Sequence, residues 1–213
     1  SSSDTDHDPT FGLWNTVECR TNTQLIFPLG EQNANGVVIA FDIFPISGGE
    51  SIQGLFAFRN SASNTVTIHA QLASDRRVNV WYNSAGASHA WNNIITSTGA
   101  LTNGNPKFIF EIYMTDIHKQ YSVWNRVIVE LVQAQPSEFA VGYCSGRIWI
   151  NGVGMSRTYF AAFSAGKYLF TDMDNVEIML CSRRQEGDSS NILYYGNYDL
   201  MNFMWFKGSE GLY

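Results

Sequence analysis

The sequence predicts an all-β protein, folded as an antiparallel sandwich or barrel, on three observations. Many short segments alternate apolar and polar residues with a period of two, as strands with one buried face do. Clusters of Gly, Asn, Ser and Pro separate these segments, and no long amphipathic helical period is present. The 213 residues suit one large β domain. Many short strands with few helices favour a sandwich or barrel over any βαβ fold.

The expected strands follow one another along the whole chain after a polar leader of residues 1–22, which we expect to be extended or an interface arm. Residues 23–213 then form a single domain. In chain order the strands are Thr23–Leu29, Gly36–Phe44, Leu55–Arg59, Asn64–Leu72, Arg77–Tyr82, Lys107–Thr115, Val123–Gln133, Val141–Ile150, Thr158–Phe163, Val176–Cys181 and Leu200–Phe206.

The stretch "NTVTIHAQLASDRRVNVWYN" shows how alternation assigns the two faces of a predicted hairpin. In "TVTIHAQL" the apolar face holds Val66, Ile68, Ala70 and Leu72, and the polar face holds Thr65, Thr67, His69 and Gln71. In "RVNVWY" the two faces hold Val78 with Val80 and Asn79 with Trp81. "SDRR" then reads as a charged turn in which Asp75 is a turn residue.

Two long Gly/Ser/Asn-rich connections, residues 83–105 and 183–197, exceed the usual loop length. Such loops commonly carry function or form interfaces. Short helical turns are expected at Met114–Trp124 and within Ser88–Ile95. "GYCSGRIWINGVG" lacks the spacing of a phosphate-binding loop and predicts a strand, Arg147 to Ile150, followed by an Asn-Gly turn.

Composition excludes several classes of function. The net charge is −6 and no run of Lys or Arg occurs, which argues against a protein that grips nucleic acid by itself. No apolar run approaches the ~20 residues that span a bilayer. Three widely spaced cysteines, Cys19, Cys144 and Cys181, leave at least one unpaired and suit a reducing compartment.

No catalytic, metal or cofactor site is predicted. His69 lies on a polar strand face, where a solvated or interface histidine is the simpler interpretation, and no nucleophile motif accompanies it or His7, His89 and His118. "DTDHD" (Asp4, Asp6, Asp8) lacks the Gly and Glu of a calcium loop, and turn chemistry explains "TDMDN" (Asp172, Asp174). A buried free cysteine is the simpler interpretation of Cys144.

Aromatic residues leave a binding function open. Only 15% of residues are charged whereas 14% are aromatic, which indicates much surface covered by neutral polar groups or by partners. Flat aromatic faces pack on pyranose rings, so a carbohydrate-binding β-sandwich is one hypothesis. Its candidate stacking residues are Trp81, Tyr82, Trp91 and Trp124. The alternative is that each Trp, with Trp149 and Trp205, fills a core or a subunit contact.

The layout of the chain resembles a capsid subunit of picornavirus-like viruses of insects and marine hosts. The strand "GVVIAFDIF" is followed by "GLFAFRNSASNTVTIHAQLASDRRVNVWYNSAG", in which Phe58-Arg59-Asn60 leads into a polar strand and a second strand ends in an aromatic before a Gly-containing loop. "PKFIFEIYMTDIHKQY" resembles the entry to the second half of such a sandwich. "SRRQEGDSSNILYYGNYDLMNFMWFKGSEGLY" resembles its polar loop and aromatic tail. The Asp-Asp-Phe signature of some insect-virus capsid proteins is absent, so no cleavage residue is carried over.

The resemblance implies an eight-stranded viral jelly roll that assembles with sister capsid proteins into an icosahedral shell around RNA. The leading hypothesis is therefore a structural protein of the virion without enzymatic activity or cofactor, assembled in the host cytoplasm and open to a host receptor. Its acidic charge leaves contact with the RNA indirect at most. The carbohydrate-binding sandwich is the alternative, and an enzyme on a β scaffold is third.

Overall fold

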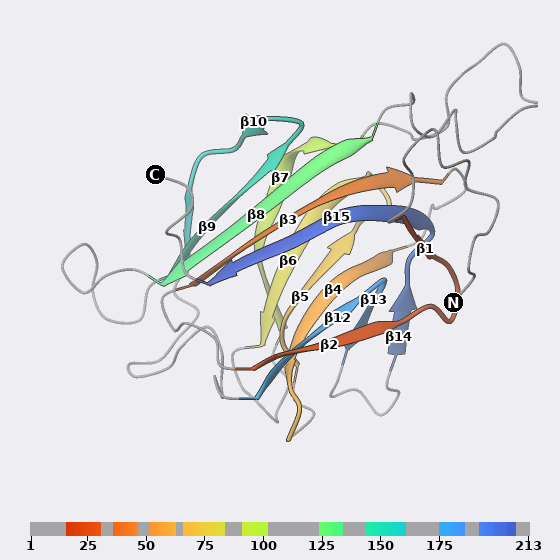
Figure 1. Ribbon diagram of the computed structural model, residues 1–213. Coiled ribbons are helices and arrows are strands. Elements are labelled where there is room, and N and C mark those ends of the chain that lie inside the picture. The colour runs from red at the N-terminus through yellow and green to blue at the C-terminus, as the bar shows by residue number, and fades with distance from the viewer. Residues whose placement is uncertain are drawn as a thin grey trace, which may run out of the picture.

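The computed structural model describes residues 16–30, 36–46, 52–62, 66–83, 91–101, 124–133, 144–160, 175–185 and 192–207. Every regular element in these ranges is a β-strand. Two antiparallel sheets face each other across one core, with the strands of sheet A drawn in front of those of sheet B (Figure 1). The predicted all-β antiparallel sandwich is confirmed.

Sheet A has the strand order β1-β15-β3-β8-β9-β10, and β11 also pairs with β9. Sheet B has the order β2-β12-β4-β5-β6-β7, and β13 pairs with β14 as a separate hairpin. The described sheets thus hold seven and six strands, where the resemblance implied eight in all. The strand bounds are β1 (Val17–Cys19), β2 (Leu25–Gly30), β3 (Gly36–Pro45), β4 (Gln53–Asn60), β5 (Val66–Leu72), β6 (Arg77–Asn83), β7 (Trp91–Ala100), β8 (Asn125–Gln133), β9 (Cys144–Ile150), β10 (Val153–Gly154), β11 (Thr158–Phe160), β12 (Val176–Leu180), β13 (Ser182–Gln185), β14 (Ile192–Tyr195) and β15 (Tyr198–Lys207).

The core lies between the sheets and is built from the apolar positions of each alternating strand. Phe41 of sheet A meets Phe56 of sheet B edge to face, with ring centroids 6.4 Å apart. Val66, Ile68, Ala70 and Leu72 of β5 are buried, as are Val78 and Val80 of β6. Burial of such side chains stabilises the fold by about 25 cal/mol per Å² of apolar surface.

One edge of the sandwich is closed by direct packing of β7 against β9. Gly146 of β9 makes this approach possible, because a Cβ there would lie 2.2 Å from Cδ1 of Ile95 and 2.9 Å from the carbonyl oxygen of Glu130. Beyond it, Asn151 and Gly152, both with positive φ, form the predicted Asn-Gly turn between β9 and β10.

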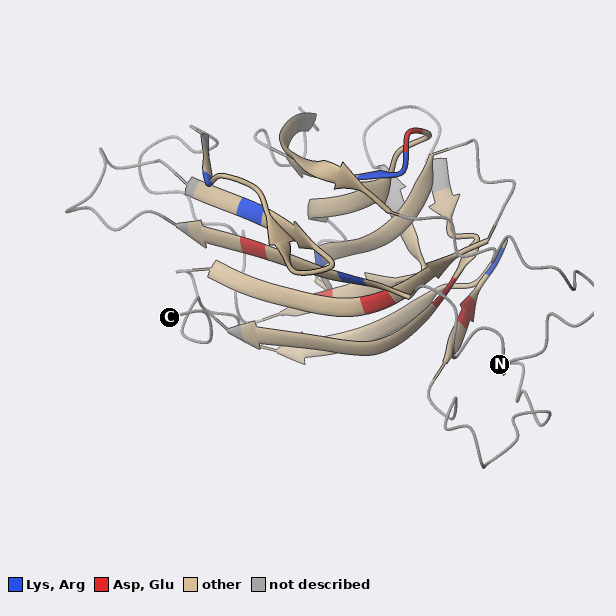
Figure 2. Cartoon of the chain, turned by 90° about the horizontal axis from the view of Figure 1, so that it is seen from above, with Lys and Arg blue, Asp and Glu red and all other residues tan. Residues whose placement is uncertain are grey.

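Charged residues are sparse over the described strands, and most of the ribbon carries none (Figure 2). Three buried carboxylates of sheet A, those of Glu130, Asp42 and Asp199, are each bound by arginine. Glu130 accepts from Arg147 and Arg157 at 2.7 and 2.8 Å. Asp42 pairs with Arg126, and this hydrogen bond raises the pKa of the guanidinium against an opposing effect of burial. These pairs neutralise charges that burial would otherwise penalise.

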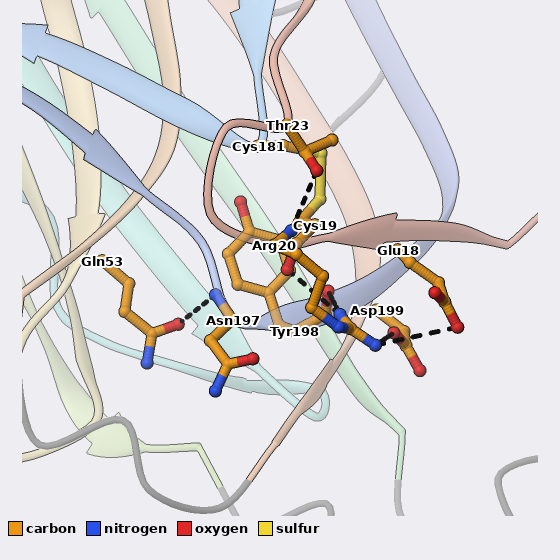
Figure 3. A network of polar contacts seen from close by, with 9 residues as sticks. All are labelled: Glu18, Cys19, Arg20, Thr23, Gln53, Cys181, Asn197, Tyr198 and Asp199. Atoms are coloured by element: carbon orange, nitrogen blue, oxygen red, sulfur yellow. Dashed lines mark hydrogen bonds and ion pairs between the residues drawn. A yellow bond between two sulfur atoms is a disulfide. The ribbon is translucent and has the colours of Figure 1, made fainter. Parts of the chain in front are cut away.

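A disulfide between Cys19 and Cys181 joins β1 of sheet A to the end of β12 of sheet B (Figure 3). Disulfides are typical of oxidising compartments, so the pairing corrects the expectation of a reducing one. Beside it, Arg20 donates to Asp199 at 2.7 Å and to the carbonyl of Tyr198 at 2.8 Å. Because β1 and this network hold residues 17–20, part of the predicted leader belongs to the sandwich.

Most expected strands are found at or near their predicted positions. The differences lie in the polar connections: β7 covers the second half of the stretch Ser88–Ile95, where a helical turn was expected, and the paired strands β13 and β14 include residues 183–185 and 192–195 of the predicted loop 183–197. The strand Lys107–Thr115 and most of the turn Met114–Trp124 fall outside the described residues. The described part contains no helix long and apolar enough to cross a membrane. Nor do its residues bring together three or more potential metal ligands.

Candidate functional site

The candidate site is a band of polar and aromatic side chains on the face of sheet B that points away from sheet A. It crosses three neighbouring strands and consists of His69 and Gln71 on β5, Asn79 and Trp81 on β6, and Asn93 and Thr96 on β7. Cross-strand pairing places them side by side. His69 lies opposite Trp81, and Trp81 lies opposite Asn93. Gln71 lies opposite Asn79, and Asn79 lies opposite Thr96. We call these six residues the sheet B band.

The aromatic centre of the band is the pair His69 and Trp81. Their ring centroids are 6.3 Å apart with 23° between the planes, so the imidazole stacks on the indole. His69 is buried, and Trp81 is half-buried. We expected either a solvated or an interface histidine at this position. Because His69 is 1% exposed, it is not solvated.

Three side chains of the band hold buried polar atoms that have no hydrogen-bond partner within the described part of the chain. These atoms are Oε1 of Gln71, Oδ1 of Asn79 and Nε1 of Trp81. Buried polar atoms almost always have a partner, and leaving one unpaired costs about 1–3 kcal/mol. Two acceptors and one donor thus lie on adjacent strands with their hydrogen-bonding capacity unused.

Exposure increases across the band from β5 to β7. Gln71 is 4% exposed, Asn79 is half-buried, and both Asn93 and Thr96 are exposed. On this exposed side Thr96 donates from Oγ1 to Oδ1 of Asn93 at 3.3 Å. The band therefore opens to solvent at β7.

The structure separates the four predicted stacking residues. Trp81 lies in the band, but Tyr82 points to the other face of β6 and is buried in the core, which removes it from the candidates. Trp124 directly precedes β8 of sheet A, and its ring packs on Phe44 of β3 with centroids 5.5 Å apart. Trp91 begins β7, and its side chain is outside the described part.

Sequence reasoning placed some members of the band together without recognising them as a site. Alternation assigned His69 and Gln71 to one face of their strand, and Asn79 and Trp81 to one face of the next. The missing step was the register between the strands, which brings these pairs opposite each other. Asn93 and Thr96 were missed because β7 was expected to be a loop.

No protein-family model matches the sequence, and a search of curated proteins also gave no match. Solved structures share the fold. The chain is similar to the heptameric SAP-like pentraxin from Limulus polyphemus, with a TM-score of 0.52 and 9% identity over 91% of this chain and 75% of the other.

Two larger proteins contain a similar region. The chain is similar to part of tailspike protein 2 from Escherichia coli O157:H7 bacteriophage CAB120, with a TM-score of 0.50 and 11% identity over 90% of this chain. It is also similar to part of NanB in a complex with Optactamide, with a TM-score of 0.50 and 9% identity over 92% of this chain. It spans 22% and 26% of those two proteins. At these identities the likeness establishes the β-sandwich fold.

Proposed function

We propose that the protein is a carbohydrate-binding β-sandwich and that the sheet B band is its binding face. The observation that carries the proposal is the set of unpartnered polar atoms on Gln71, Asn79 and Trp81 beside the stacked indole. A ligand for this face has to supply a hydrogen-bond donor for each amide oxygen and an acceptor for the indole N–H.

Sugars meet this requirement closely. Each hydroxyl group both donates and accepts, so one pyranose ring presents partners of both kinds at short spacing. The opposite, apolar side of such a ring packs on an aromatic face. His69 covers the β5 side of the Trp81 indole. In this proposal the sugar packs on the side of the indole that faces Asn93 of β7, where the band is exposed.

The same chemistry sets the expected strength of binding. Each amide oxygen that gains a hydroxyl partner recovers part of the roughly 1–3 kcal/mol that it loses while unpaired. Ring stacking adds apolar contact, whereas immobilising the ligand opposes binding by several kcal/mol. Micromolar to millimolar affinity for a single sugar unit is the expected outcome.

A glycan array probed with the isolated chain tests the proposal. The expected result is binding to a defined set of glycans that Trp81→Ala abolishes. Trp149→Ala is the matched control, because Trp149 is also half-buried on a strand but lies on sheet A, stacked under the guanidinium of Arg147. No binding to any glycan, or equal loss in both variants, would exclude the band as a sugar site.

A capsid subunit is a second candidate. It is favoured by large apolar side chains that are exposed on β2 and β15: Ile26 at 40%, Met204 at 40% and Phe206 at 48%. Exposed apolar residues of this kind are commonly covered by neighbouring chains. Under this proposal the protein occurs in particles with sister capsid chains, which electron micrographs of the native source would reveal. Its location in a virion assembled in the host cytoplasm is part of the same proposal.

A further inference from the structure

The edge of the sandwich opposite β7 and β9 contains an apolar cleft that is separate from the sheet B band. Its volume is about 380 Å³, within the usual range of small-ligand sites. Sheet B contributes Leu25, Phe27 and Leu29 of β2, and sheet A contributes Leu200, Phe203 and Trp205 of β15. The cleft is therefore an inter-sheet space, reached from the edge.

Strand pairing explains why this edge is open. β2 is the outermost strand of sheet B, and β1 pairs only with Tyr198, Asp199 and Leu200 of β15. Beyond Leu200, the inward-facing side chains of β15 have no β1 residue beside them in the described part. Phe27 and Trp205 stand on the two sides of the opening and are 47% and 39% exposed.

The lining of the cleft follows both β2 and β15 along their length. Its lining includes four residues of β2, within the stretch from Leu25 to Leu29, and five residues of β15, within the stretch from Leu200 to Trp205. At about 3.4 Å per residue step, these stretches measure about 14–17 Å. A cleft that follows two strands over this length suits one extended, unbranched carbon chain in van der Waals contact with both walls.

The chemistry of the walls agrees with an apolar occupant. Asn202 is the one polar residue among the described lining residues, and its Nδ2 donates to Asp42 at 2.8 Å. On the sheet A wall, the Phe203 ring stacks on Phe41 with centroids 6.4 Å apart. Among the residues that the structure describes, the lining contains no charged side chain to favour an ion over hydrocarbon.

We propose that this cleft binds a single unbranched alkyl chain, such as the tail of a fatty acid or of another amphiphile, inserted between the two sheets. The polar head remains in solvent at the mouth, near Phe27 and Trp205. The site is independent of the carbohydrate site, because none of its lining residues belongs to the sheet B band.

Quenching of tryptophan fluorescence tests the proposal directly. Dodecanoate brominated along its chain is titrated into the intact protein at concentrations below those at which it aggregates. Saturable quenching is expected, and Trp205→Phe should remove most of it, because Trp205 lines the cleft. Absence of saturable quenching, or equal quenching in Trp205→Phe, would overturn the proposal.

A filling variant provides a second test by calorimetry with unlabelled dodecanoate. Leu29→Trp replaces an aliphatic side chain of the lining with a larger indole, which fills part of the cleft and should weaken binding at least tenfold. Val153→Trp is its control, since Val153 is 76% exposed on β10 and should leave the affinity unchanged. Trp81→Ala should also bind dodecanoate normally, which separates this site from the carbohydrate site. Unchanged affinity in a folded Leu29→Trp variant would contradict the proposal; if that variant does not fold, the quenching comparison decides.

Discussion

The imidazole of His69 is stacked on the indole of Trp81, its direct cross-strand partner, with 6.3 Å between ring centroids. This contact lies at the centre of the sheet B band, and the indole N–H has no acceptor among the described residues. One residue pair away, Gln71 and Asn79 hold amide oxygens in the same condition. Preorganised rings and buried polar atoms without partners are features of a binding face. Such atoms lower the stability of the free protein, but they can bind a ligand.

Gln71→Met should separate function from stability. Because Oε1 of Gln71 is buried and unpartnered, an apolar side chain of similar size should leave the free energy of unfolding unchanged or raise it by about 0.5–1 kcal/mol. Glycan affinity should fall about tenfold, since one hydrogen bond to the ligand is lost. Urea unfolding and glycan calorimetry measure the two effects.

Gln53→Met is the matched control for that substitution. Gln53 is 4% exposed, like Gln71, but its Oε1 accepts from the backbone N–H of Asn197 at 2.8 Å. This variant should lose about 1–2 kcal/mol of stability and keep its glycan affinity. A destabilisation of Gln71→Met as large as that of Gln53→Met would show that Gln71 serves the fold.

Tyr198 should make the protein sensitive to alkaline pH. Its hydroxyl donates to the carbonyl of Gly54 at 2.8 Å in the core, and burial raises its pKa well above the usual value of 10. The unfolded chain releases this proton near pH 10 and the folded chain does not, so stability is constant below about pH 10 and falls as the pH rises above it. Urea unfolding between pH 8 and 11.5 should show this fall.

Tyr198→Phe identifies the source of that pH dependence. The variant should lose about 1 kcal/mol at neutral pH, because the carbonyl of Gly54 loses its donor. Above pH 10 the stability of the variant should fall less steeply than that of the wild type. The slopes differ because unfolding of the variant releases one proton fewer per molecule. Identical alkaline slopes would mean that Tyr198 titrates alike in both states.

Removal of the disulfide should lower stability substantially. Cys19 and Cys181 are 162 residues apart in sequence, and cross-links that close long loops restrict the unfolded chain most. Replacing both with Ser should cost about 2–5 kcal/mol in urea unfolding. Reduction of the wild type should produce the same loss, and no change in either experiment would show that the pair is not bonded.

Glu130 should be among the side chains whose loss is most costly. It is fully buried, and both of its oxygens accept from arginine. Glu130→Ala leaves Arg147 and Arg157 without their carboxylate and should cost about 3–5 kcal/mol. Asp75→Ala, at an exposed turn, should cost less than about 1 kcal/mol. Thermal and urea unfolding of the two variants measure the difference.

Alternation predicted the hairpin of β5 and β6 because every residue there obeys a strict period of two. The charged turn was also predicted, and Asp75 accepts from the backbone N–H of Arg77 at 3.1 Å. β7 was missed because its pairing with β6 shifts register at two places, so that "WNNIITSTGA" has no regular period. Alternation in a sequence indicates a strand with one buried face. Irregular pairing interrupts the alternation, so the strand is not recognised.

Features that depend on contacts between distant segments were the least accessible from sequence. The Cys19–Cys181 bond depends on the edge of one sheet meeting the end of a strand of the other. Trp81 and Tyr82 were grouped as candidates although neighbouring strand residues point to opposite faces, and only Trp81 lies in the band. The cleft also escaped detection, because its lining joins β2 to β15 across the fold.

The indole N–H resonance of Trp81 provides the most direct measurement of the carbohydrate-binding proposal. In two-dimensional ¹H–¹⁵N NMR spectra, titration with a glycan selected on the array should shift this resonance, assigned by its loss in Trp81→Phe, with saturation. The resonance of Trp149 on sheet A should stay in place. A Trp81 indole resonance that does not move while the glycan binds, or shifts confined to other indoles, would contradict the account.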